Sequence, residues 1–163
     1  MPITDTKTKQ DAIKRALADL ADTRIIVGVI GAKAAYPVTK NANLADIASF
    51  NEFGTSSGSY SGRGIPSRSF LRSTFDEQQE SYSKIIGQLV KRAMAGTMTR
   101  DQIANRLGMT IKADVDRKIV TLSTPPNTET TIKLKGSSNP LIAKGQLRQS
   151  IEYDIRRKSE VKK

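Results

Sequence analysis

The fold of this chain is decided by residues 71–115, LRSTFDEQQESYSKIIGQLVKRAMAGTMTRDQIANRLGMTIKADV. In the first half of this stretch, apolar side chains recur at intervals of three, four or seven residues, which is the spacing of one helical face. These side chains are Leu71, Phe75, Tyr82, Ile86, Leu89 and Ala93. The pattern predicts a long helix that ends near Gly96.

A second helix follows after a short connection at residues 95–98. Thr99 and Gln102 form a capping-box pattern, which marks a helix start. Apolar residues then recur every four positions, at Ile103, Leu107, Ile111 and Val115. The two helices are therefore predicted to form an antiparallel hairpin. Gly108 weakens the second helix by about 1 kcal/mol relative to Ala.

The residues before the hairpin predict smaller elements. Residues 9–22 carry one apolar helical stripe, made of Ile13, Ala16, Leu17 and Leu20. Residues 24–30 are β-branched and predict a largely buried strand, and a second strand is expected near residues 34–38. Asn43 can cap a short helix, and Gly54 stands where the end of that helix needs a positive φ.

The residues after the hairpin complete the expected sheet. A mixed segment without a clear period follows residues 123–127, and residues 144–149 can form one helical turn. Residues 150–156 alternate apolar and polar side chains, which predicts a half-exposed strand. That strand is the natural partner of residues 25–30.

These elements predict an α+β fold in which a small antiparallel or mixed sheet packs against the helical hairpin. The Gly- and Ser-rich residues 54–67 cannot supply a core and are expected to form a long flexible loop. Residues 1–157 are predicted to be a single domain. Residues 158–163 are predicted to be a basic C-terminal tail.

The composition excludes several functional classes. The 163 residues include no Cys, no His and no Trp, so disulfides, thiolate zinc sites and the usual catalytic bases are absent. No catalytic residue, cofactor or metal is therefore expected. The chain also lacks an apolar run long enough for a membrane span and an N-terminal secretory pattern, which favours a cytoplasmic location.

Positive charge is concentrated in the second part of the chain. Residues 1–60 carry 7 basic and 6 acidic side chains, whereas residues 61–163 carry 20 and 10. Such an excess favours contact with DNA or with an acidic protein surface, and an ordinary solvated surface is the alternative. The few aromatic residues do not form a strip for stacking bases.

Two short motifs could suggest an enzyme. Residues 54–58 match G-x-S-x-G, but that chemistry needs a base beside the serine and the chain has no histidine. Residues 81–84 match S-x-x-K, but they lie in the middle of the predicted long helix. A hydrolase acting through Ser56 or Ser81 is therefore disfavoured.

Two longer segments carry a family resemblance. The first is Asn51-Glu-Phe-Gly-Thr55 followed by Ile65-Pro-Ser-Arg-Ser-Phe-Leu-Arg72, and the second is Asn139-Pro-Leu-Ile-Ala-Lys-Gly-Gln-Leu-Arg-Gln-Ser-Ile151. Together they resemble the tailed-bacteriophage neck or tail-completion proteins, a family similar to the lambdoid minor tail protein Z. The resemblance covers roughly residues 20–157. The chain departs from the family pattern in two places: the family often has Pro where this chain has Ser69, and Asp-Thr where this chain has Ala143-Lys144.

The resemblance implies a non-enzymatic virion protein that is assembled in the host cytoplasm and located at the head–tail junction. Copies would form a ring, expected to be a hexamer, that joins the head–tail connector to the tail terminator or tube proteins. Double-stranded DNA would pass through its lumen, and no membrane is involved. The rival hypothesis is a basic DNA-binding module that acts as a monomer or dimer.

The motifs and their surroundings supply the candidate residues. Candidate contacts to other subunits or partners are Tyr60, Arg63, Ile65, Arg68, Arg72 and Arg148. Residues expected to determine the fold are Glu52, Phe53, Gly54, Pro66, Phe70, Leu71, Pro140, Leu141, Gly145, Leu147 and Ile151.

Overall fold

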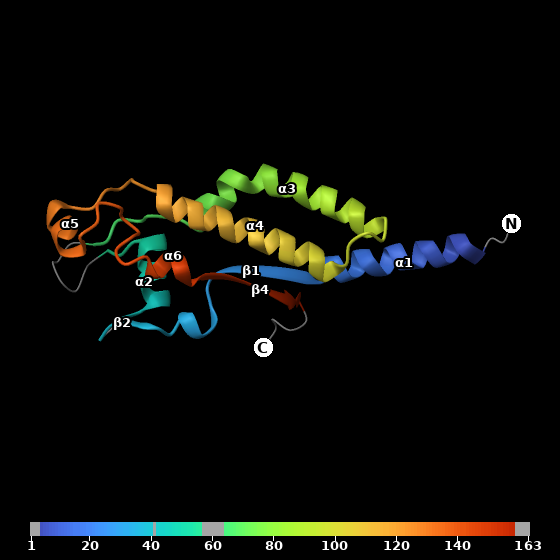
Figure 1. The fold of residues 1–163 in the computed structure, drawn as a ribbon, viewed down its shortest axis with the longest axis horizontal. Helices are drawn as coiled ribbons and strands as arrows, with labels where there is room; N and C mark the ends of the chain where they lie inside the picture. Colours follow the sequence, from blue (N-terminus) through green and yellow to red (C-terminus); the bar gives the residue numbers. More distant parts are fainter. Residues whose placement is uncertain (1–3, 41, 57–63, 159–163) are drawn as a thin grey trace. The chain divides into compact units, whose positions relative to one another are not determined.

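The computed structural model of the chain describes residues 4–40, 42–56 and 64–158 (Figure 1). Their elements, in order, are α1 (Thr4–Ala21), β1 (Thr23–Val29), the 3-10 turn η1 (Gly31–Lys33), β2 (Pro37–Thr39), β3 (Ala42–Asn43), α2 (Leu44–Phe53), α3 (Arg72–Met94), α4 (Arg100–Thr121), α5 (Glu129–Lys135), α6 (Gln146–Ser150) and β4 (Ile151–Arg157). The strands form two small sheets, β1 with β4 and β2 with β3. The predicted α+β class is confirmed.

The chain divides into two compact units. The first contains residues 1–26, 78–110 and 153–163, and the second contains residues 27–77 and 111–152. Helices α3 and α4 and strands β1 and β4 each contribute residues to both units. Neither unit is therefore a continuous piece of chain, and the single domain over residues 1–157 stays a prediction.

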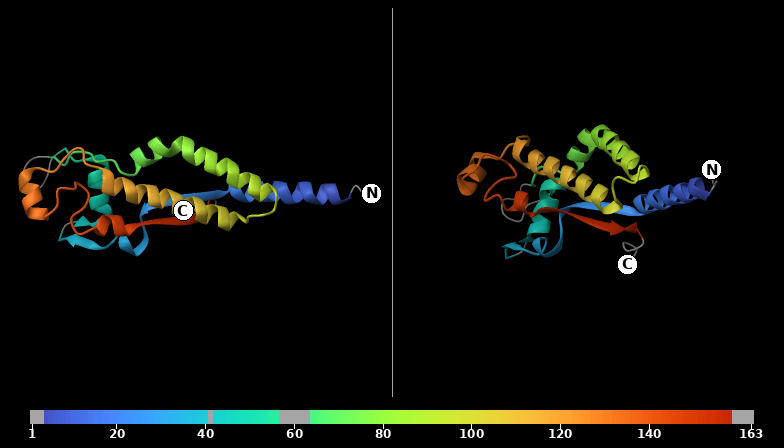
Figure 2. Two further views of the ribbon diagram at one scale, coloured as in Figure 1. Left: turned by 45° about the horizontal axis from the view of Figure 1, so that its top comes forward. Right: turned by 45° about the vertical axis from the view of Figure 1, so that its right-hand side comes forward.

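The first unit contains the closed end of the helical hairpin. Residues 78–94 of α3 and 100–110 of α4 lie side by side in Figures 1 and 2. Leu89, Ala93 and Ile103 are buried between them, and Leu20 of α1 packs against this cluster. The predicted capping box is confirmed, because the N–H of Thr99 donates to the Gln102 side chain at 2.9 Å and the N–H of Gln102 donates to the Thr99 hydroxyl at 3.3 Å.

The predicted pairing of the first and last long strands is also confirmed. The N–H of Lys158, just after β4, donates to the carbonyl of Asp22, just before β1, at 2.8 Å. The start of β1 therefore lies beside the end of β4, which makes the pair antiparallel. Helix α4 lies close to β4 at Gly108, where an added Cβ would come within 2.9 Å of Cγ of Tyr153.

In the second unit, α2 begins and ends as predicted. Asn43 and Asp46 form a capping box, with side chain to backbone distances of 2.9 Å in both directions. Gly54 ends the helix with φ 74°. The strand expected at residues 34–38 is wrong in position: Gly31, at φ 64°, begins the turn η1, and β2 starts only at Pro37.

Helix α5 was not predicted, because residues 129–135 have no apolar face. None of its residues is buried. It is held instead by its ends: the Thr128 side chain accepts the N–H of Thr131, and Gly136 closes the helix in the left-handed conformation.

The core of the second unit is built from residues that the motifs predicted. Phe70 and Ile151 are fully buried together with Val115 and Ile119 of α4. Leu141 and Leu147 are also buried, whereas Leu71 is only half-buried. An ion pair between Lys118 and Glu77 holds the end of α4 beside the start of α3. Among the described helices, none has the length and hydropathy that a bilayer-spanning segment requires.

Candidate interaction surface

The E-F-G-T turn and the I-P-S-R segment lie directly against each other. The N–H of Thr55 donates to the carbonyl of Ile65 at 2.9 Å. A Cβ on Gly54 would lie 2.8 Å from that carbonyl oxygen and 2.9 Å from the nitrogen of Ser67. Because φ at Gly54 is 74°, both the backbone conformation and the close approach require glycine.

Glu52 connects the first part of this motif to the start of α3. Its side chain is only 4% exposed, and its carboxylate accepts the N–H groups of Phe70, Leu71 and Arg72 at 2.8, 2.9 and 3.0 Å. The hydroxyl of Ser69 donates to the same carboxylate at 2.6 Å. N–H groups at a helix start have no partner within their own helix. Glu52 therefore caps α3 from α2, and also places a negative charge at the positive end of the helix dipole.

These contacts determine the protonation of Glu52. Burial alone would raise the pKa of the Glu52 carboxyl. The hydrogen bonds from Ser69 and from the N–H groups of Leu71, Arg72 and Phe70 outweigh it, so the pKa is lowered. The carboxylate is consequently ionised at neutral pH and acts as a fixed structural anion.

Arg72 covers one side of this arrangement. Its Nε lies 3.1 Å from Oε1 of Glu52, and its guanidinium carbon lies 4.8 Å from the ring centre of Phe53. The Phe53 residue is 65% exposed. A guanidinium over an aromatic face is attracted to the ring, so Arg72 favours this position of the exposed Phe53 side chain.

Beside Phe53 lies a groove of about 300 Å³. It is bounded by the end of β1, one side of α2 and the start of α3, all within the second unit. The residues of α2 that line it are small, apart from Glu52 and Phe53 at its end. The full lining is Val27, Gly28, Val29, Ile30, Ala45, Ala48, Ser49, Glu52, Phe53, Leu71 and Arg72. The groove therefore presents a largely apolar concave surface.

Arg68 has an internal role. Only 8% of the residue is exposed, and its guanidinium donates to the carbonyls of Pro125 and Pro126 at 2.9 and 3.1 Å. Burial lowers the pKa of Arg68, and burial together with the nearby Arg68 charge lowers the pKa of Lys135. The ammonium of Lys135 donates to the carbonyl of Pro140 at 2.8 Å. We therefore assign Arg68 to the fold rather than to subunit contact.

The second motif is organised by Asn139. Its side-chain oxygen accepts the N–H groups of Leu141 and Ile142 at 2.9 and 3.0 Å, and its amide donates to the carbonyl of Val120 at 2.9 Å. This side chain closes the Asn-Pro turn and attaches it to the end of α4. Gly145, at φ 74°, then starts α6 and leads to the buried Leu147.

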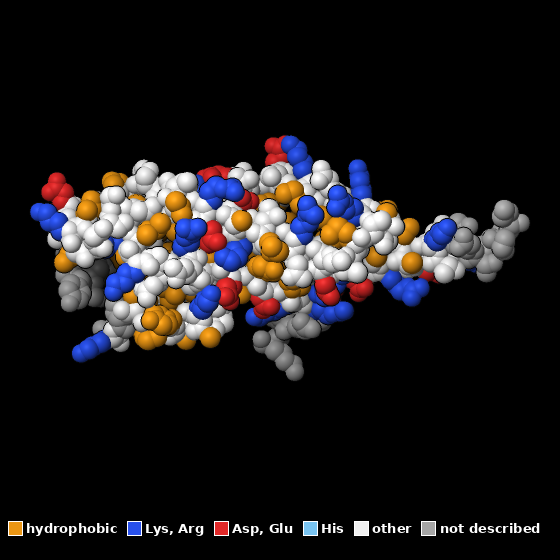
Figure 3. All heavy atoms as spheres, in the orientation of Figure 1, with side chains coloured by type: hydrophobic (Ala, Val, Ile, Leu, Met, Phe, Trp, Pro, Cys, Tyr) orange, Lys and Arg blue, Asp and Glu red, His pale blue; other side chains and the backbone are white. Residues whose placement is uncertain are grey.

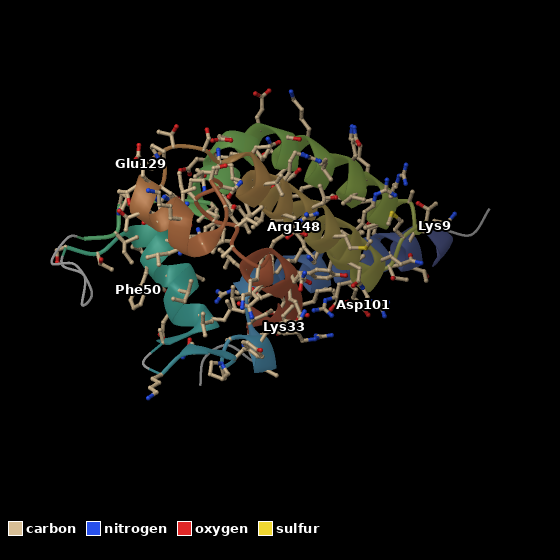
Figure 4. All side chains as sticks on the ribbon, turned by 60° about the vertical axis from the view of Figure 1, so that its left-hand side comes forward. Lys9, Lys33, Phe50, Asp101, Glu129 and Arg148 are labelled. Carbon is tan, nitrogen blue, oxygen red and sulfur yellow. The ribbon has the colours of Figure 1, made fainter. Side chains whose placement is uncertain are left out.

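Of the other predicted contact residues, Tyr60 and Arg63 lie outside the described residues, and Ile65 is half-buried. Pro66, which was predicted to determine the fold, is exposed. Arg148 is exposed on α6, as Figure 4 shows. The groove itself was not predicted from the sequence. Its signal was present in the small side chains at Ala45, Ala48 and Ser49, whose spacing places them on one face of α2.

On the face in Figure 3, Lys and Arg are interspersed with acidic and apolar side chains. A smaller pocket of about 150 Å³ in the first unit is lined by Arg92, Arg106, Gln88 and Thr110 together with apolar side chains. The guanidinium groups of Arg92 and Arg106 and the amide of Gln88 are donors that could receive an anion, whereas the hydroxyl of Thr110 donates to the carbonyl of Arg106 at 2.9 Å.

The two motifs that could suggest an enzyme, S-x-x-K and G-x-S-x-G, show no catalytic arrangement among the described residues. Lys84 of the S-x-x-K pattern pairs with Glu80 at 2.6 Å on the exposed side of α3. The G-x-S-x-G pattern extends beyond the described residues at its second half. Within the part of the chain that the structure describes, no group of His, Cys, Asp or Glu is placed to hold a metal ion.

Comparisons with protein families, with curated proteins and with solved structures find no match to this chain. The geometry of the two motif segments and of the surface beside them is therefore the basis for the functional interpretation.

Proposed function

We propose that this chain is a non-enzymatic structural protein of a tailed bacteriophage. Copies form a ring at the head–tail junction, expected to be a hexamer, which joins the connector to the tail proteins and lets DNA pass. The protein is made in the host cytoplasm and resides in the virion. The observation that carries this proposal is the apolar groove beside the exposed Phe53, positioned by the same E-F-G-T and I-P-S-R-S-F-L-R residues that carry the family resemblance.

The physical argument concerns what the motif residues do. Glu52, Gly54 and Arg72 fix the end of α2 against the start of α3, and the result is an exposed aromatic ring beside a concave apolar surface. Exposed apolar surfaces of this kind are typical of protein contacts. A contact between two different faces of identical copies generates a ring when its rotation closes.

The proposal is tested in the phage that carries the gene. Interrupting the gene should yield filled heads and finished tails that fail to join, and cryo-EM of intact particles should locate the protein at the neck. Complementation with the wild-type gene is the control. Mature, infectious particles that lack this polypeptide would contradict the proposal.

A second candidate is supported by the pocket that Arg92 and Arg106 line. Those arginines, with Gln88, could hold a phosphate, which suits the rival hypothesis of a DNA-binding monomer or dimer. That rival predicts DNA affinity that falls steeply with salt and no ring in electron micrographs. Replacing both arginines with Ala would then lower the salt slope by about 2, roughly one for each phosphate contact. Rings without measurable DNA affinity would exclude it.

A further inference from the structure

Helix α1 carries an apolar stripe that lacks a complete partner in its own unit. Ile13, Ala16, Leu17 and Leu20 are spaced i, i+3, i+4 and i+7, and each is only half-buried. None of the described side chains of α1, residues 7–21, is fully buried. Leu20 packs against the cluster around Leu89. An isolated helix of this length is marginal in water, so burying the rest of the stripe would stabilise α1.

The junction between α1 and β1 fixes the direction in which α1 leaves the strand. The N–H of Asp22 donates to the carbonyl of Ala18 at 3.0 Å, and the hydroxyl of Thr23 donates to the carbonyl of Asp19 at 2.7 Å. Arg100 donates to the Thr23 hydroxyl at 2.8 Å. Figure 1 shows α1 continuing from the first residues of β1. If α1 folded back along its own strand, these contacts would break.

The groove in the second unit has the properties that such a stripe requires. Its walls are apolar and include Val27, Val29, Ala48 and Leu71. Its rim carries the exposed Phe53. An amphipathic helix docks in a hydrophobic groove through side chains at i, i+3, i+4 and i+7, which is the spacing of the stripe on α1.

The charges also favour α1 as the occupant. Helix α2 carries Asp46 and Glu52 and no basic residue, and Glu52 is paired with Arg72. Asp46, which follows the groove residue Ala45 in the sequence, accepts the N–H of Asn43 at 2.9 Å and forms no ion pair with the described Lys and Arg residues, so its negative charge is not neutralised by them. The stripe on α1 is followed directly by exposed basic residues, Lys14 and Arg15. Opposite charges at the edge of an apolar contact favour the correct partner and register.

We propose that the apolar stripe of α1 docks in the groove between β1 and α2 of a second copy of this chain. Each copy gives its helix to one neighbour and receives a helix from another, so the contact is head-to-tail. This inference rests on the proposed function, because it supplies the contact by which a ring would close.

The test uses full-length variants that alter one surface each. Leu17→Asp places a charge in the stripe, with Ala18→Asp on the exposed side of α1 as its control. Ser49→Trp fills the groove from an exposed position, with Phe50→Trp at the next residue as its control. Circular dichroism establishes that each variant is folded, and native mass spectrometry over a concentration series measures assembly. Both surface variants should raise the concentration needed for assembly by at least about tenfold, and both controls should not.

Mixing the two surface variants gives the sharper result. Ser49→Trp retains an intact α1 and Leu17→Asp retains an intact groove, so an equal mixture should form a one-to-one heterodimer that cannot extend. Wild-type rings that neither variant affects would overturn this inference and leave the proposed function standing. A wild-type chain that stays monomeric, or a mixture of folded variants without heterodimer, would also overturn it. A Leu17→Asp variant that loses stability but still forms assemblies of the wild-type mass would also overturn this inference, because the stripe would then dock within one chain. Where the protein lies in the virion decides the proposed function separately.

Discussion

The carboxylate of Glu52 accepts the backbone N–H of Phe70 at 2.8 Å across a sequence separation of 18 residues. The bond joins the last turn of α2 to the residues that begin α3. Both oxygens of Glu52 are used by this start, because Oε2 also accepts from Leu71 and Oε1 from Ser69 and Arg72. A single buried anion therefore fixes where the longest helix of the chain begins.

Replacing Glu52 with Gln should destabilise the fold by about 3 kcal/mol. Gln keeps the size of the side chain, but its NH₂ group would face N–H donors, and buried donors without acceptors cost about 1–3 kcal/mol each. Urea unfolding at neutral pH measures the effect. Glu129→Gln, in the exposed first turn of α5, is the matched control and should change stability by less than about 0.5 kcal/mol. Equal effects at both positions would contradict the role assigned to Glu52.

The same carboxylate predicts a pH dependence. The pKa of Glu52 is lower in the folded chain than its ordinary value, so its stabilising contribution is present above the unfolded pKa of about 4.3. That contribution is lost as the pH falls through the folded pKa. The stability difference between wild type and Glu52→Gln should therefore shrink below about pH 4. Urea titrations between neutral and acidic pH test this expectation, and a constant difference throughout would exclude it.

The local sequence predicted the helices well but not the role of Glu52. Apolar spacing and the Thr99 cap are local patterns, and they gave α3 and α4 close to their observed bounds. The partners of Glu52 come from residues 69–72, and nothing near Glu52 in the sequence indicates which distant N–H groups it meets. The motif resemblance marked Glu52 as important for the fold, but its capping contacts emerge only from the tertiary arrangement.

The groove and helix α5 were not predicted from the sequence, for two different reasons. The groove exists because α2 has small side chains at Ala45, Ala48 and Ser49 on one face, but that pattern does not indicate which elements form the other walls, β1 and the start of α3. Helix α5 has no buried residue, so it lacks the apolar period on which helix prediction depends. Capping by Thr128 and Gly136 determines it instead.

Gly54→Ala should destabilise the chain by about 3 kcal/mol. The substitution meets two costs: the backbone at φ 74° and ψ 177° lies in a region essentially restricted to glycine, which costs another residue about 1–3 kcal/mol, and the new Cβ would lie 2.8 Å from the carbonyl oxygen of Ile65. Gly136→Ala is the control, because Gly136 also has a positive φ, 67°, but lies in the left-handed α region with ψ 19° and has no atom within 4 Å of an added Cβ. It should show only the backbone cost of that region, about 1–2 kcal/mol. Thermal and urea unfolding of both variants would measure the difference, and equal losses would mean that the close approach to Ile65 is not limiting.

Gly108→Ala should destabilise the chain although Ala is the better helix former. By propensity alone the substitution would gain about 1 kcal/mol, but the new Cβ would lie 2.9 Å from Cγ of Tyr153, whose hydroxyl is held by Asn105 at 3.1 Å. Overpacking of this kind typically costs 1–3 kcal/mol, so a net loss of about 1 kcal/mol is expected. Gly87→Ala in α3 is the control: its Cβ would meet nothing within 4 Å, and the variant should be more stable than wild type. The loss at Gly108 should disappear when Tyr153 is replaced by Val, because the smaller side chain makes room. A stabilising Gly108→Ala in the wild-type background would contradict the packing of α4 on β4.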